Sequence, residues 1–452
     1  MNRRPHIART ADEASTLLDR RKLFELAALL NGSISCTIDQ RLHEGQEHAV
    51  IRLQFENNAQ WAVRMPINPN GKFPGDDIEL PLQIMRSTTS LQQCLYKHGI
   101  LVPRVHWSCL QWTENPVGYP VVLTDWIEGQ PLDWEGIRHH PEAKAKVLAQ
   151  LAEFMFNLST LTESSEALKD LQALHPNGMF PLYRLNPDNS VTAQTAAEWY
   201  YKDIDRRLLR SLRGLLKDVS PLEILSLRSS IPEYIVKHTE PLDCDRPVLF
   251  HDDIHPGNII IDSQGELRGY FFSPMSTLTL RIIDWDMVSL VPVEAAIKLP
   301  TFLSKTMCAN SGWEVTDADR ELYVQAFRNC ELAKSKSEMT PLTNLLATSF
   351  KRAYFHEAFH SLSVHRKWFE EHGRNPAQQL LQELDDFCHA NSGNIWGLQD
   401  EVIGLRTVIE ASRNQRSFNG VIEGKARRQK IRRGVENGCT RKIATITPNY
   451  GM

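Results

Sequence analysis

The sequence predicts an α+β protein of two unequal lobes, a small β-rich lobe followed by a larger, mainly helical one. Residues 49–55 alternate between apolar and polar side chains, as a half-buried antiparallel strand does. Apolar residues in 143–158 instead recur at helical spacing and form one stripe. Glu128-Gly129-Gln130-Pro131 interrupts the pattern between these two regions, so we expect the lobes to join near 124–129.

Each element of the first lobe has its own local signal. We expect strands at 35–41, 49–55, 61–65 and 120–126, and a helix at 80–98. The polar tetrapeptide 56–59 offers a tight turn between two strands, and Gly99 ends the helix. Beyond Pro292 the pattern is mostly helical up to Gln415, with segments such as 342–368.

These signals divide the chain into four predicted parts. They are an N-terminal extension (1–20), a β-rich N-lobe (21–126), a mainly helical C-lobe (127–423) and a basic tail (424–452). We expect the tail to be disordered; a localisation signal or an RNA contact is the alternative reading of its basic cluster.

Composition narrows the class of protein. The apolar content of 42%, the charged content of 23% and the net charge of −4 are ordinary for a globular protein and give no basic field for nucleic acid. We find no run of 18 apolar residues and no apolar core in the first 21 residues, so we expect neither a membrane span nor a secretory signal. The eight cysteines form no C-x-x-C pair, which favours reduced thiols in the cytoplasm. The sequence does not indicate an oligomeric state.

The chemistry concentrates in residues 248–262, which read VLFHDDIHPGNIIID. Two apolar runs flank a polar segment, and Pro256-Gly257 forbids a continuous helix, so this is a loop between two short strands. A further apolar run ends in Ile283-Asp284-Trp285, which places another acid directly after a buried strand. Polar side chains on a loop anchored at both ends are typical of catalytic loops.

Phosphoryl transfer requires these residue types. The reaction needs an Asp beside the acceptor hydroxyl, and oxygen ligands for the magnesium ions that bridge the phosphates. Asp253, Asn258 and Asp284 supply that set.

The pattern H-x-D-x-x-x-x-N followed by I-D-W resembles the signature of aminoglycoside phosphotransferases, choline kinases and their fungal homologues. The resemblance implies a protein-kinase-like fold and transfer of the ATP γ-phosphate to a hydroxyl of a small molecule. It implies that the N-lobe (21–126) binds the nucleotide and that the C-lobe (127–423) carries the catalytic loop, the metal site and a helical substrate region. It implies that Asp253 is the catalytic base and that His251 braces its loop. Asn258 and Asp284 would then hold Mg²⁺.

Weaker similarities extend through the N-lobe. The segment Trp61-Ala62-Val63-Arg64 resembles the strand that carries the phosphate-binding cation, so Arg64 and Ala62 become nucleotide-site residues. Gly45 stands where a glycine-rich loop is expected. Thr124 and Trp126 belong to a segment that looks like the hinge whose backbone pairs with adenine.

Several residues depart from the family pattern. Arg64 replaces the usual Lys, only one glycine remains in the phosphate loop, and the helix lacks the expected Glu, for which Glu79 is the nearest candidate. These departures favour an alternative, a pseudokinase that binds nucleotide with little or no turnover. Residues 270–281 lengthen the segment between Asp253 and Asp284, as a loop extension or an error of the gene model.

Other polar residues near the loop have two readings. His255 is a metal ligand or, as we expect, a residue that packs or hydrogen-bonds within its loop, and Asp262 begins a turn. Asp252 and Asp286 are additional metal ligands or surface carboxylates. His251-Asp252 could also belong to a metal-dependent phosphohydrolase, but such pairs usually lie on helices.

The helical region offers no comparable motif for the acceptor. It contains acids that would attract a cationic substrate, namely Glu383, Asp385 and Asp386. The identity of the substrate does not follow from the sequence.

Overall fold

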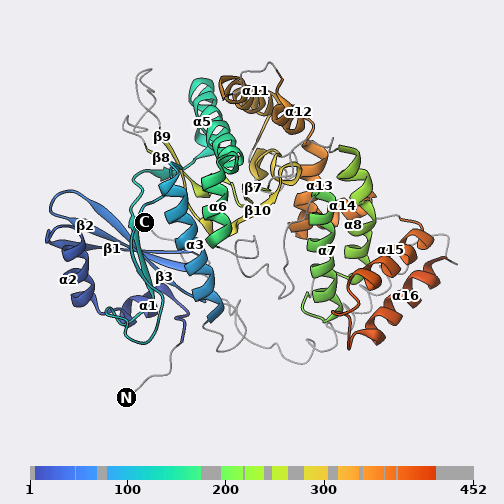
Figure 1. Cartoon of the computed structure of the whole chain (residues 1–452), viewed down its shortest axis with the longest axis horizontal. Coiled ribbons are helices and arrows are strands. Elements are labelled where there is room, and N and C mark those ends of the chain that lie inside the picture. The colour runs from blue at the N-terminus through green and yellow to red at the C-terminus, as the bar shows by residue number, and fades with distance from the viewer. Residues whose placement is uncertain are drawn as a thin grey trace, which may run out of the picture. The chain divides into compact units, whose positions relative to one another are not determined.

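The structure is a computed structural model that describes residues 6–45, 47–68, 79–137, 139–174, 195–216, 219–238, 247–262, 279–303, 314–334, 339–360, 362–372 and 375–413 (Figure 1). Packing divides the chain into two compact units. Unit 1 comprises Met1–Trp199 and Glu233–Glu357, and unit 2 comprises Tyr200–Pro232 and Ala358–Met452. This division differs from the lobe boundary expected near residue 126, which stays a prediction.

The first part of unit 1 is an antiparallel sheet of five strands among the described residues, in the order β1-β2-β3-β5-β4. The strands are β1 (Cys36–Glu44), β2 (His48–Phe55), β3 (Gln60–Pro66), β4 (Val105–Cys109) and β5 (Val121–Asp125). The alternation read from the sequence is confirmed, since Ala49, Ile51, Leu53 and Phe55 of β2 are buried.

Helices cover both faces of this sheet. The helices α1 (Ala11–Leu17) and α2 (Arg20–Leu30) pack on the face that bears Ile51 and Val63. On the other face, α3 (Glu79–Lys97) packs Leu82 and Met85 against Val122. Part of the segment set apart as an N-terminal extension therefore contributes to the core of the sheet, because its small buried alanines recur every three residues: Ala8, Ala11 and Ala14.

The segment predicted to be catalytic lies in two further antiparallel ladders of unit 1. In one, β7 (Pro247–His251) pairs with β10 (Val288–Pro292); in the other, β8 (Ile259–Asp262) lies between β6 (Gln130–Pro131) and β9 (Thr279–Ile282). Short 3-10 turns follow at η4 (Pro256–Asn258) and η5 (Trp285–Met287). The predicted loop between two short strands is confirmed.

The segment 270–281, considered as an insertion, ends inside β9. Its last three residues pair with β8, with Arg281 opposite Ile260, and the rest of the segment lies outside the described residues. The predicted basic tail, 424–452, lies outside them as well.

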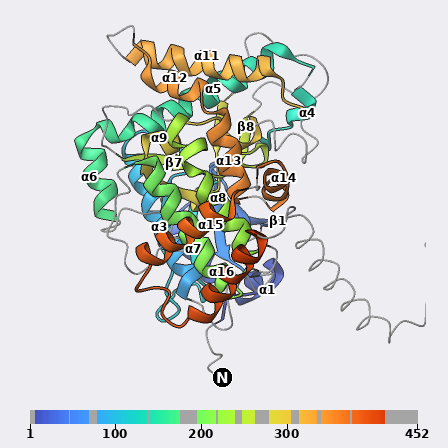
Figure 2. The same cartoon turned by 90° about the vertical axis from the view of Figure 1, so that its right-hand side faces the viewer.

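Further described helices of unit 1 support these ladders. They are α4 (Trp134–Ile137), α5 (Pro141–Thr160), α6 (Ser165–Leu174), α9 (Val293–Ala296), α11 (Asp317–Lys334) and α12 (Pro341–Ala347). Short turns lie at η1 (Leu161–Glu163), η3 (Val236–His238) and η6 (Thr301–Leu303). Figures 1 and 2 both show α11 lying along α5, and the predicted stripe of α5 is buried at Val147, Leu151 and Leu158.

Unit 2 is helical in its described part. It contains most of α7 (Ala196–Leu212) and α8 (Pro221–Tyr234), the end of α13 (Phe350–His360), and then α14 (Leu362–His372), α15 (Ala377–Ala390) and α16 (Gln399–Arg413). Figure 2 shows α15 and α16 side by side. Within the described ranges, no helix combines the length and the apolar character that crossing a membrane requires.

Candidate active site

The predicted catalytic loop is anchored at both ends by strands. His251 lies opposite Val288 in one ladder, and Ile259 lies opposite Ile282 in the other. The apolar residues that flank the loop are buried, which fixes the backbone of residues 252–258. The sequence thus places its polar residues on a supported loop.

Asp253 and Asn258 lie in contact within this loop. The Asn258 amide nitrogen donates to Asp253 Oδ2 and to the Asp253 carbonyl oxygen, each at 3.0 Å. The amide oxygen is then the atom that Asn258 offers to a metal ion. Burial acts to raise the pKa of Asp253, but His255 and His251 outweigh it, so the pKa lies below its ordinary value and the carboxylate is ionised at neutral pH.

Asp284 lies beside this pair. The backbone N–H of Ile283 donates to the Asn258 carbonyl at 3.0 Å, so the two predicted metal ligands come from neighbouring segments. Asp284 has φ +60°, a left-handed conformation that costs energy for a residue other than glycine.

The carboxylates around Asp284 repel one another. Burial first, and then the negative charges of Asp286 and Asp253, raise the pKa of Asp284, while Arg64 lowers it. Solvent still reaches part of Asp284, so the repulsion by the neighbouring carboxylates is the firmer of these causes. Clustered oxygen donors of one charge, together with an amide oxygen, fit a hard divalent cation such as Mg²⁺.

Asp286 has different neighbours, all buried or half-buried. Thr88 Oγ1 on α3 donates to Asp286 Oδ1 at 2.6 Å. Arg64 Nη2 and His48 Nδ1 lie 3.5 and 3.4 Å from Asp286 Oδ2. Burial would raise the pKa of Asp286, but His48, Arg64 and Thr88 lower it below its ordinary value. The reading of Asp286 as a surface carboxylate is therefore wrong.

The predicted nucleotide-site residues of the sheet share one face. In the ladder, Ala62 lies between Arg52 and Thr124, and Arg64 lies between Val50 and Val122. Neighbours across a ladder point to the same side. Ala62, Arg64 and Thr124 are therefore brought together, as their assignment to one site requires.

Trp126 and Gly45 lie at the ends of this face. The centre of the Trp126 ring lies 5.3 Å from the centre of the His43 ring. The Arg52 guanidinium also lies 5.3 Å from the centre of the Trp126 ring. The backbone N–H of Trp126 donates to the Gln60 carbonyl oxygen at 3.0 Å, so this N–H of the predicted hinge is hydrogen-bonded within the protein. Gly45 N donates to His48 O at 2.8 Å in the turn between β1 and β2.

The other loop residues are held by protein contacts. His251 is buried, and its Nδ1 accepts from Asp253 N at 3.3 Å, which fits a bracing role. Asp252 is no surface carboxylate, since its Oδ1 lies 2.6 Å from His356 Nε2 and both side chains are buried. His255 Nδ1 accepts from Gly257 N at 3.1 Å, so the predicted hydrogen bond within the loop is confirmed.

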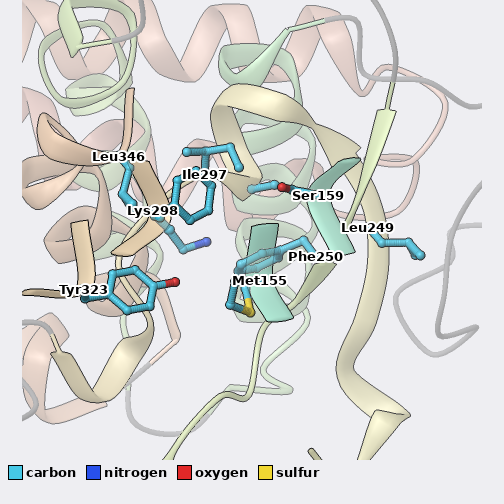
Figure 3. A pocket seen from close by; sticks show the side chains of 10 residues that line it. Met155, Ser159, Leu249, Phe250, Ile297, Lys298, Tyr323 and Leu346 are labelled. Atoms are coloured by element: carbon cyan, nitrogen blue, oxygen red, sulfur yellow. The ribbon is translucent and has the colours of Figure 1, made fainter. Parts of the chain in front are cut away.

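Two cavities lie among the described residues of unit 1. One, of about 10 Å³, has room for no more than one water molecule; Figure 3 shows the Lys298 amine and the Tyr323 hydroxyl directed into it. The other, of about 670 Å³, has the volume of a small-molecule pocket and includes Trp61, Trp126 and Arg281 in its lining. Of the predicted nucleotide-site residues, its lining includes Trp126 but not Ala62, Arg64 or Thr124, so it does not coincide with the face that those three share.

A separate group between α3 and α6 has ligand types that suit a transition metal. Ligand atoms of Cys94, His98 and Asp170 lie within 4.8 Å of one another. Asp170 Oδ2 already lies 2.6 Å from Lys97 Nζ and 2.9 Å from His98 Nε2. Burial and the Asp170 charge raise the pKa of the Cys94 thiol to about 11. These contacts describe an ion-pair cluster, and we assign no metal to it.

Sequence reasoning missed two residues of the site, His48 and Thr88. Strand alternation places His48 on the same face as Val50 and Arg52, and this signal could have located it. Glu79, the candidate partner of Arg64, instead lies 2.6 Å from Arg86. No local pattern indicates that the partner of Arg64 would come from the turn after β9.

Comparisons with known proteins agree with the resemblance read from the sequence. The family model described as "Phosphotransferase enzyme family" matches residues 40–293. A curated relative, clavilactone A biosynthesis cluster protein Y of Ampulloclitocybe clavipes, is 24% identical over 237 residues, which cover 48% of this chain and 53% of that protein. The chain thus spans about half the length of the curated relative that it matches.

Solved structures are similar at low identity. An ethanolamine kinase from Plasmodium vivax matches with a TM-score of 0.45 at 12% identity, over 78% of this chain and 82% of that one. A macrolide 2′-phosphotransferase from Brachybacterium faecium matches with a TM-score of 0.41 at 14% identity, over 76% of this chain and 93% of that one. The family match and the observed elements, a β-rich front followed by a mostly helical remainder, confirm the predicted kinase-like fold class.

Proposed function

This chain belongs to the phosphotransferase enzyme family, and from that premise we propose that it transfers the γ-phosphate of ATP to a hydroxyl of a small molecule. The observation that carries the proposal is the contact between Asn258 and Asp253, with Asp284 held beside them by the Ile283–Asn258 backbone bond. A base and two oxygen ligands are then presented by adjacent segments.

In this mechanism Asp253 accepts the proton that the acceptor hydroxyl loses as its oxygen bonds to the γ-phosphorus. The bond between the γ-phosphorus and the β–γ bridging oxygen breaks, and ADP leaves. The low pKa of Asp253 keeps it in the ionised form that orients the hydroxyl. Asn258 and Asp284 would hold Mg²⁺, which when bound neutralises phosphate charge. His251 holds the loop through its bond with Asp253 N.

Nucleotide binding is assigned to the face shared by Ala62, Arg64 and Thr124. Arg64 would contact phosphate, since a guanidinium can donate two parallel hydrogen bonds to it. The Trp126 ring would lie beside the adenine of the nucleotide, and the turn that contains Gly45 would lie over the phosphates. In this proposal the first lobe, 21–126, binds the nucleotide, and the second lobe, 127–423, carries the catalytic loop and binds the acceptor.

The proposed location is the cytoplasm. In the described part of the chain, Cys36, Cys94, Cys109, Cys330 and Cys388 carry no disulfide, which is usual for a reducing compartment.

The test is transfer of phosphate by the purified chain. With Mg²⁺, ATP and a panel of small-molecule alcohols, we expect ADP release and a phosphorylated product detected by mass spectrometry. Asp253→Ala should abolish both, whereas Asp400→Ala, a change at an exposed carboxylate of α16, should not.

The departures at Arg64 and in the glycine-poor loop favour one alternative, a pseudokinase. Binding of Mg-ATP, seen as a rise in thermal stability, without any phosphorylated product across the panel would support that alternative.

A further inference from the structure

The cation of the proposed nucleotide site is paired in an unexpected way. Arg64 Nη2 lies 3.5 Å from Asp286 Oδ2, and their side chains are 15% and 7% exposed. Asp286 comes two residues after Asp284, so the partner of the cation belongs to the segment that also carries a proposed metal ligand. In protein kinases this partner is a glutamate of the helix.

Asp286 is itself held from two other elements. The Thr88 hydroxyl of α3 donates to its Oδ1 at 2.6 Å, and His48 Nδ1 of β2 lies 3.4 Å from its Oδ2. The intervening Trp285 is buried, and its Nε1 donates to Ile282 O at 3.0 Å, which fixes the turn. The helix therefore supplies a neutral donor where the kinase pattern expects an acid.

We propose that Asp286, held by Thr88, is the positioning residue that aims Arg64 at the nucleotide phosphates in place of a helix glutamate. This inference rests on the proposed function. It accounts for the missing acid on α3: the negative charge has moved to the metal-bearing turn, and a second charge on the helix is not required.

A merely structural role makes a different prediction. A buried carboxylate that only neutralises Arg64 would, when changed, alter stability without altering the affinity for ATP. Arg64 Nη2 lies 3.5 Å from Asp286 Oδ2 and 3.4 Å from His48 Nδ1, both longer than the ordinary N–H···O distance of about 2.9 Å, so the attraction between charges contributes more to the position of the guanidinium than a short hydrogen bond does.

The first experiment measures ATP affinity by calorimetry and KM for ATP with the full chain. Asp286→Asn keeps the shape and removes the charge; we expect ATP affinity to fall at least tenfold and KM for ATP to rise by a similar factor. Thr88→Val should cause a smaller loss, about threefold. The control is Asp319→Asn, another buried aspartate, paired with Lys144 at 2.8 Å, which should lower stability and leave ATP affinity unchanged.

The second experiment moves the charge back to the helix. Thr88→Glu in the Asp286→Asn background should restore at least half of the lost affinity. Asp286→Asn should add little to Arg64→Met, because both remove the same interaction. Thermal unfolding of each variant verifies that it folds.

The outcomes separate the two proposals. A wild-type chain that binds no ATP overturns both. If the wild-type chain binds ATP and the folded Asp286→Asn variant binds it with the same affinity and the same KM, the positioning role alone is overturned and the proposed function stands.

Discussion

His356 Nε2 of α13 lies 2.6 Å from Asp252 Oδ1, so the proposed catalytic loop is tied to a helix 104 residues further along the chain. Both side chains are buried, and the His356 ring stacks on Trp199 at 6.0 Å. The residue next to the proposed base is thereby fixed by a long-range contact.

Removal of this contact should weaken the loop. His356→Leu takes a partner from the buried carboxylate of Asp252, and we expect the free energy of unfolding to fall by about 3 kcal/mol in urea titrations. His356→Gln, which keeps a donor, should lose less. Equal stability of the wild type and His356→Leu would contradict the role given to this pair.

His251 should make stability depend on pH. Burial lowers its pKa to about 4, against the attraction of the Asp253 and Asp252 carboxylates and with a small contribution from His255. An unfolded histidine titrates near about 6.5, so below that pH the unfolded state binds the proton first and folding is disfavoured.

The free energy of unfolding should therefore decrease as the pH falls from about 6.5 to about 4. The decrease should reach about 3 kcal/mol and then level off. The measurement is the difference in unfolding free energy between wild type and His251→Asn at pH 7 and pH 4. A difference that does not change with pH would exclude the buried neutral state of His251.

Gly129 should not tolerate a side chain. It has φ +130°, and a Cβ there would lie 2.3 Å from the Ile261 carbonyl oxygen. We expect Gly129→Ala to cost more than about 3 kcal/mol, because strain and a backbone clash add. Gly99→Ala is the matched control: its φ is +78° with nothing within 4 Å, so it should cost only about 1 kcal/mol. Equal losses in thermal unfolding would show that the clash is relieved.

Arg228 should stabilise unit 2. Its Nε lies 2.8 Å from Asp205 Oδ1, it also pairs with Glu383, and all three are buried or nearly so. Arg228→Met leaves two carboxylates without their cation and should cost about 4 kcal/mol, read from hydrogen exchange in α8 and α15.

The control for this change is an exposed pair of the same unit. Arg406 pairs with Asp385 at the surface, so Arg406→Met should cost less than about 1 kcal/mol. Similar losses for both variants would contradict the distinction between buried and exposed pairs. Two of the acids that the sequence suggested for a cationic substrate, Glu383 and Asp385, are thus paired with Arg228 and Arg406 within unit 2.

Local signals were sufficient for the elements that carry the site. The strand expected at 49–55 is β2, and the helix expected at 80–98 is α3, within one residue at each end. Alternation and helical periodicity arise from one face of an element meeting the core, so they are visible in the sequence. The expected helical stretch 342–368 is instead α12, α13 and part of α14, because its periodicity carries no mark of where one helix ends and the next begins, as at Ala347 and Phe350.

The sequence by itself determined the chemistry of the loop, because the offset from Asp253 to Asn258 fixes their contact once Pro256-Gly257 turns the chain. Only the tertiary structure decided which side chains from distant parts of the sequence meet around it. Thr88 and Asp286 are 198 residues apart, and a pairing at that distance is set by how helices and strands pack. Coulomb and hydrogen-bond energies act over a few ångströms in space, whereas a sequence records only separation along the chain.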